Sequence, residues 1–213
     1  MKLYLSSYKF GNHPEELVRL AGKNKKAAVI MNAVDYGDPE RRQVSAQSQI
    51  DKLIELGFEA RELDLRDYFN KPSQLNEYLK NIDLVWIYGG NAFILQRAFK
   101  QSGFGELIKA AVKSEKIIYA GFSAAVCLAA PTLLGIDIVD DPNIVPEKYE
   151  KEFSWDGLGL INYNIAVHYR TDHPESADTE KEVAYYQENN IPYKTLRDGE
   201  VIILDQAKEA LSK

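Results

Sequence analysis

Short apolar runs alternate along the first two thirds of this chain with longer segments that mix apolar and polar positions. Four of these runs predict buried strands, at residues 3–5, 27–31, 84–88 and 116–120. Residues 60–65 predict a weaker strand, because charges alternate there with Leu63 and Leu65. Between the strands, helices are predicted at residues 14–20, 40–56, 93–99, 107–112 and 124–130. This alternation favours an α/β fold with three layers, in which a mainly parallel sheet lies between helices.

The last third of the chain is less regular. Residues 140–155 form a charged, proline-containing loop, residues 158–167 predict a strand that ends at His168, and residues 175–189 predict a charged helix. Residues 193–196 and 201–204 flank an Asp-Gly pair, which indicates a hairpin turn. The tail from Gln206 is predicted to be a short helix.

Length and charge narrow the possible classes of protein. The chain has 213 residues, enough for one sizeable α/β domain, and its net charge of −6 argues against nucleic-acid and anionic-membrane partners. A single cysteine, Cys127, excludes an internal disulfide and is typical of a reducing compartment. No apolar run approaches the roughly 20 residues that cross a bilayer, and the first residues do not predict a signal peptide. We therefore expect a cytoplasmic protein.

Ser123 lies between a predicted strand and a predicted helix, with small residues on both sides. The order is typical of a nucleophile elbow: a strand, then Gly121 to Ala124 with the serine at 123, then a helix. In such an elbow a sharp turn lifts the serine hydroxyl clear of the sheet and points the N-terminus of the helix toward it. The alternative is a serine that only caps a buried helix. The full elbow pattern has glycine where Ala125 stands.

A nucleophilic serine requires a base, and the chain holds only three histidines. His168 ends a predicted strand, at the edge of the sheet where Ser123 should also lie, so it is the preferred base. His173 lies in the next loop and is the alternative, while His13 is interpreted as a helix-capping or solvated residue. Because the spacing of His168 and His173 offers neither a helical face nor a third ligand, no metal site is expected.

Backbone donors and an orienting acid complete the candidate site. Gly90, at the end of a strong strand, and Ala124, directly after the serine, offer N–H groups for an oxyanion hole. The alternative for residues 89–91 is a tight turn with Asn91 as a helix cap. Three acids after the elbow helix could orient the histidine: Asp137, Asp140 and Asp141.

In their order along the chain these pieces resemble the peptidase E family, which includes aspartyl dipeptidases and cyanophycinases. The likeness extends over residues 84–173, and its pieces are residues 89–91 with Phe93 and Leu95, residues 120–124, Pro131 with Thr132, residues 157–160 and residues 167–169. The resemblance implies one peptidase E-like domain over residues 1–213, with a fold like that of class I glutamine amidotransferases. It further implies that Ser123 is the nucleophile, His168 the base, and the amides of Gly90 and Ala124 the oxyanion hole.

Three positions depart from the family pattern. Ala125 stands where glycine is usual, and Ala92 replaces a small hydroxyl residue. The orienting acid does not align cleanly; Asp137 is preferred over Asp140 and Asp141. An arginine that reads an acidic substrate side chain is also expected from aspartyl dipeptidases, and Arg170 and Lys181 are the candidates for that role.

The functional expectation is a serine peptidase that cleaves short peptides, without a metal or organic cofactor, as a monomer or homodimer. A preference for Asp-X dipeptides is implied by the resemblance alone. Two alternatives stay open. Ala125 favours an amidotransferase-like binding protein that no longer turns over substrate. An esterase of the α/β-hydrolase kind is disfavoured by the short chain, by Ala125 and by the lack of a His-Gly-Gly run.

Overall fold

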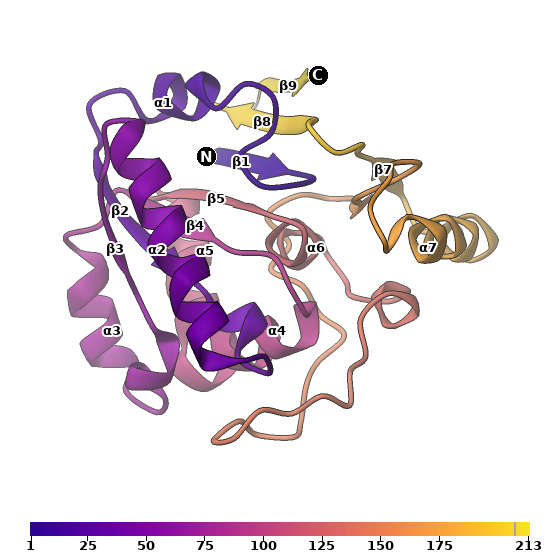
Figure 1. The fold of residues 1–213 in the computed structure, drawn as a ribbon, viewed down its shortest axis with the longest axis horizontal. Helices are drawn as coiled ribbons and strands as arrows, with labels where there is room; N and C mark the ends of the chain where they lie inside the picture. Colours follow the sequence, from indigo (N-terminus) through magenta and orange to yellow (C-terminus); the bar gives the residue numbers. More distant parts are fainter. Residues whose placement is uncertain (207) are drawn as a thin grey trace.

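The computed structural model describes residues 1–206 and 208–213. Within this part, seven strands form one sheet in the order β3-β2-β4-β5-β1-β8-β9 (Figure 1). These strands are β1 (Lys2–Ser6), β2 (Lys26–Ile30), β3 (Glu59–Glu62), β4 (Leu84–Ile87), β5 (Ile118–Phe122), β8 (Val201–Asp205) and β9 (Lys208–Ser212). Neighbours among β1 to β5 pair in parallel, whereas β8 and β9 add antiparallel. The predicted α/β fold with a mainly parallel sheet is confirmed.

Helices cover both faces of this sheet. They are α1 (Glu15–Ala21), α2 (Pro39–Glu55), α3 (Pro72–Leu79), α4 (Ala92–Ser102), α5 (Phe104–Lys113) and α6 (Ala124–Ala129), whereas α7 (Ser176–Glu188) packs against other residues. Side chains alternate across each strand, so that in β5 Ile118 and Ala120 pack toward α1 and α2, and Tyr119 packs toward α3 to α6. Apart from α3, which was not predicted, each helix that covers this sheet begins and ends close to a predicted segment.

The strand predicted at residues 158–167 is largely wrong. Only β6 (Asn164–Ala166) forms, and it pairs in parallel with β7 (Tyr193–Thr195) in a separate two-stranded sheet. In Figure 1, β7 and α7 lie beside the main sheet, beyond the first residue of β8. His168 therefore follows a strand that is not part of the main sheet.

The predicted hairpin between residues 193–196 and 201–204 is also wrong. β7 pairs with β6, while β8 pairs antiparallel with β1, so the turn at Asp198 and Gly199 carries the chain from one sheet to the other. A tight turn does form there, with Gly199 at φ 95° and its carbonyl accepting a hydrogen bond from the Asn12 amide. An Asp-Gly pair specifies the turn but does not specify which strands it joins.

The tail forms a strand and not the predicted helix. β9 pairs antiparallel with β8 over five residues, and so satisfies backbone groups that an edge strand would otherwise expose. Residue 207, which the helix prediction included, lies outside the described residues.

Candidate active site

Ser123 occupies a strained turn between β5 and α6. Its backbone has φ 52° and ψ −113°, a combination that side-chain-bearing residues rarely adopt and that is typical of a nucleophile elbow. Its carbonyl accepts hydrogen bonds from the amides of Val126 and Cys127, at 2.7 and 3.1 Å, which begin α6. Ser123 itself is half-buried. Within the described residues its hydroxyl makes no hydrogen bond to protein, and so none to His168.

Ala125 fits this elbow because residue 121 has no side chain. A Cβ added to Gly121 would lie 2.7 Å from the Cβ of Ala125 and 2.4 Å from the carbonyl oxygen of Ile87. Both contacts are shorter than packed atoms tolerate. The methyl group of Ala125 therefore occupies room that Gly121 leaves, and the departure from the usual glycine coexists with the strained Ser123 backbone.

The Gly89–Gly90 turn after β4 lies directly against the serine. A Cβ added to Gly89 would stand 2.9 Å from the Cβ of Ser123 and 2.8 Å from the ring of Phe122. Asn91 caps α4, because its side chain accepts hydrogen bonds from the amides of residues 93 and 94. In residues 1–206 and 208–213, the N–H groups of Gly90 and Ala124 have no acceptor. The cap that we gave as the alternative to an oxyanion hole is thus present, and the two amides stay open.

Two neighbouring residues at the end of β1 form hydrogen bonds with Ser123 and with His168. The Ser123 amide donates a hydrogen bond to the Ser6 carbonyl at 3.3 Å, and the His168 amide donates to the Ser7 hydroxyl at 2.9 Å. The ring of Tyr8 then contacts the ring of His168 edge-on, with centroids 5.9 Å apart. The structure therefore brings the predicted nucleophile and the predicted base to the same end of one strand.

Asp198 contacts the imidazole of His168. Its Oδ1 atom lies 2.6 Å from His168 Nδ1 and also accepts a hydrogen bond of 3.0 Å from the hydroxyl of Ser7. This pairing gives Nδ1 the proton and leaves the lone pair of the ring on Nε2. The imidazole is 1% exposed, so its orientation is fixed by Asp198 and by packing.

Asp198 takes the place that we assigned to one of three other acids. Asp137 is exposed in the 3-10 helix η3 (Ile136–Ile138), and Asp141 is also exposed. Asp140 accepts a hydrogen bond of 2.7 Å from the amide of Ala92, at the first residue of α4. Among the described side chains none of these three acids is hydrogen-bonded to His168. Sequence reasoning missed Asp198 because its Asp-Gly pair was interpreted only as a hairpin turn.

Two neighbouring groups have shifted pKa values. Burial lowers the pKa of His168, and the adjacent His173 lowers it further, while Asp198 acts in the opposite direction. The imidazole is thus neutral near pH 7, as a base must be. Burial raises the pKa of Asp140 to about 7, with Glu175 adding repulsion and the Ala92 amide opposing the shift.

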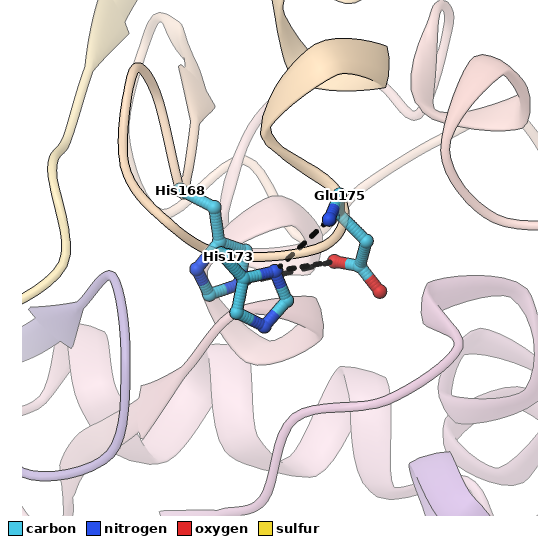
Figure 2. Close-up of side chains that lie close together, drawn as sticks. All are labelled: His168, His173 and Glu175. Carbon is cyan, nitrogen blue, oxygen red and sulfur yellow. Dashed lines mark hydrogen bonds and ion pairs between the residues drawn. The ribbon is translucent and has the colours of Figure 1, made fainter.

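His173, the alternative base, lies parallel to His168. The two rings stack with centroids 3.7 Å apart and planes 9° from parallel (Figure 2). Glu175, directly before α7, turns its carboxylate toward both rings; its Oε2 atom is 3.9 Å from His168 Nε2 and 3.8 Å from His173 Nδ1. His168 differs from His173 in its 2.6 Å contact with an aspartate, Asp198.

The sequence matches the model of peptidase family S51 over residues 8–211. This chain belongs to peptidase family S51. Peptidase E of Streptomyces coelicolor is 32% identical over 126 residues, which are 57% of this chain and 48% of that protein. An uncharacterized peptidase of Listeria innocua is 30% identical over 131 residues, 58% of this chain and 60% of that protein. The matched regions thus span about half to three fifths of these two S51 relatives.

Solved structures show the same fold. A 1.5 Å crystal structure of a peptidase E candidate from Listeria monocytogenes EGD-e superposes with a TM-score of 0.82 at 21% identity, covering 100% of this chain and 98% of the other. A peptidase from an acI-B1 actinobacterium gives a TM-score of 0.67 at 15% identity, over 95% of this chain and 82% of that one. No helix in the described part of this S51 protein is long and apolar enough to cross a membrane.

Proposed function

We propose that this S51 protein is a serine peptidase that hydrolyses short peptides, with Ser123 as nucleophile, His168 as base and Asp198 as orienting acid. The observation that carries the proposal is the 2.6 Å contact between His168 Nδ1 and Asp198 Oδ1, made where β1 also holds the strained Ser123 elbow. Asp198 replaces Asp137 in the assignment that we drew from the sequence.

The proposed reaction begins when His168 Nε2 takes the proton of the Ser123 hydroxyl as Oγ attacks the scissile carbonyl carbon. The N–H groups of Gly90 and Ala124 hold the oxyanion that develops on the carbonyl oxygen. His168 then gives its proton to the leaving amine, and a water molecule, activated by the same imidazole, releases the acyl group. The Asp198 carboxylate stabilises the imidazolium that forms after each proton transfer. The mechanism uses no cofactor.

A preference for Asp-X dipeptides is the finer part of the proposal and requires a cation near the site. Lys181 forms an ion pair with Asp178 at 2.6 Å, so its charge is engaged on the surface of α7. Arg170 also has an acidic neighbour, since its Nε atom lies 3.5 Å from Glu180 Oε1, but it lines an open groove of about 670 Å³ together with Arg197, Tyr8 and His173. This groove adjoins the imidazole pair and supports Arg170 as the residue that reads an acidic side chain.

The proposal is tested by hydrolysis of a panel of Asp-X, Ala-X and Lys-X dipeptides. Wild type should hydrolyse part of the panel, and Ser123→Ala should lose that activity. Arg170→Gln should raise KM for Asp-X peptides selectively if Arg170 reads the aspartate. Equal activity in wild type and Ser123→Ala, or equal inertness of both, would contradict a serine mechanism.

The alternative of a binding protein without turnover depended on Ala125. Because Gly121 leaves room for the Ala125 methyl group, the elbow geometry no longer favours that alternative. The match to the model of peptidase family S51 argues against the other alternative, an esterase of the α/β-hydrolase kind.

A further inference from the structure

Three side chains able to ligate a metal converge beside the candidate active site. Figure 2 shows His168, His173 and Glu175 grouped at the start of α7, and one ligand atom from each lies within 4.8 Å of the others. The sequence offered only the two histidines, so we expected no metal site there. The turn that leads into α7 supplies the missing third ligand by folding Glu175 back over the imidazoles.

One nitrogen of each imidazole lies near the same carboxylate oxygen, Glu175 Oε2. Nδ1 of His168 donates its proton to Asp198, so the free lone pair of the ring is on Nε2. This Nε2 atom lies 3.9 Å from Glu175 Oε2. His173 Nδ1 lies 3.8 Å from the same Oε2 atom and accepts a hydrogen bond of 3.3 Å from the Glu175 backbone amide, so a metal ion would displace that amide from the lone pair. A carboxylate on the far nitrogen of a histidine is the arrangement that fixes the tautomer of metal-ligating imidazoles. Asp198 supplies it here.

The donor set and its surroundings suit a divalent cation of the zinc type. Two histidines and one glutamate, with a position left for water, form a common catalytic zinc site with bonds of about 2.0–2.2 Å. Such bonds place ligand atoms a little over 3 Å apart, so the cluster must contract by up to about 1.5 Å. The side chains of Glu175 and His173 are 42% and 20% exposed, so these two are the ligands that move, and His173 must tilt out of its stack on the buried His168.

We propose that His168, His173 and Glu175 bind one Zn²⁺ ion, and that the bound ion inhibits the peptidase. The inhibitory part rests on the proposed function; the binding part does not. Inhibition follows because the metal forms its bond with the lone pair of His168 Nε2, which is the same lone pair that takes the serine proton. One imidazole nitrogen cannot hold a metal and act as a base at once. Removal of the ion returns the imidazole to catalysis.

The test is calorimetric titration of Zn²⁺ into protein stripped with a chelator. Wild type and Ser123→Ala should each bind one ion per chain with equal affinity, because Ser123 is not a ligand. His173→Gln and Glu175→Gln should weaken binding by at least about tenfold, the lower limit for loss of even an outer-shell partner. His13→Gln, at an exposed histidine far from the cluster in sequence, should bind as wild type does. Circular dichroism verifies that each variant is folded.

Zn²⁺ binding by Ser123→Ala tests the metal site independently of the proposed function, because this variant lacks the proposed nucleophile. Stoichiometric binding that depends on His173 and Glu175 supports the site even if no peptide is cleaved. Absence of binding in wild type, or binding unchanged by both glutamine variants, overturns it. Where peptides are cleaved, Zn²⁺ should inhibit, EDTA should restore the rate, and Glu175→Gln should weaken inhibition by the same factor as binding; binding without inhibition overturns the inhibitory role.

Discussion

Asp198 and His168 are 30 residues apart in the sequence, and Oδ1 of the aspartate lies 2.6 Å from Nδ1 of the imidazole. The contact is possible because the chain leaves β7 in the small sheet, turns at Asp198 and joins the main sheet as β8. The hydroxyl of Ser7 bonds both partners, accepting from the His168 amide and donating to Asp198. The end of β1 thereby fixes His168 and Asp198 together.

Replacement of Asp198 by asparagine should lower kcat by about 10³–10⁴-fold, because the amide can no longer hold the Nδ1–H tautomer or stabilise the imidazolium. The measurement is kcat on the best dipeptide of the panel. Asp137→Asn is the matched control and should keep the wild-type kcat. A large loss in the control with a small loss in Asp198→Asn would return the orienting role to Asp137.

The pH dependence of kcat/KM should have its acid limb below pH 6.5. Burial lowers the pKa of His168, so the neutral base persists below the ordinary titration range of histidine, and activity is lost only as pH falls through the lowered value. Asp140 has a pKa of about 7 and could give a limb of its own, so Asp140→Asn serves as the control. An acid limb above pH 6.5 that persists in Asp140→Asn would show that His168 is not the base.

Glu182 should make the protein less stable as pH rises from 5 to 8. Burial raises its pKa from 4.5 to about 8, so in this window the unfolded chain has lost a proton that the folded chain still holds. The resulting penalty is absent below pH 4.5 and complete above pH 8, at about 1.4 kcal/mol for each pKa unit.

Thermal unfolding measures this penalty. Glu182→Gln should flatten the fall of Tm between pH 5 and 8, because glutamine keeps an acceptor for the Tyr186 hydroxyl and carries no charge. The exposed Glu188→Gln, on the same helix, should leave the fall unchanged. Equal slopes in wild type and Glu182→Gln would show that Glu182 ionises freely in the folded protein.

Gly89→Ala should cost about 1–3 kcal/mol of unfolding free energy, because the new methyl group would overlap the Phe122 ring and the Cβ of Ser123. The serine would be displaced as well, so the rate of hydrolysis should also fall. Gly105→Ala is the control, since its Cβ would meet no heavy atom closer than 3.7 Å and lies within α5. A Gly89→Ala protein with wild-type Tm and activity would contradict the close approach of this turn to Ser123.

The elements of the first half of the chain could be predicted because each one carries its own signal. Residues 27–31 and 84–88 are continuous apolar runs, and these become β2 and β4 at the centre of the parallel sheet. The strand–serine–helix order around Ser123 is equally local, and the structure has that order with the strained backbone of an elbow.

The last third could not be predicted because its pairings join segments far apart in the sequence. The Asp-Gly pair at residues 198–199 favours a local hairpin, yet β8 pairs with β1, almost 200 residues away along the chain. That pairing is what delivers Asp198 to His168. Glu175 likewise has no motif of its own and becomes relevant only when α7 begins beside the imidazoles.

Covalent labelling by a fluorophosphonate tests the central claim most directly, because such reagents react with a serine only when a neighbouring base activates it. After exposure to the reagent, intact-mass and peptide-mass spectrometry should find one adduct, on Ser123, in wild type. Ser123→Ala should take up none, and Asp198→Asn should react far more slowly. An unlabelled wild-type protein, or an adduct at another residue, would contradict the assignment of Ser123 as an activated nucleophile.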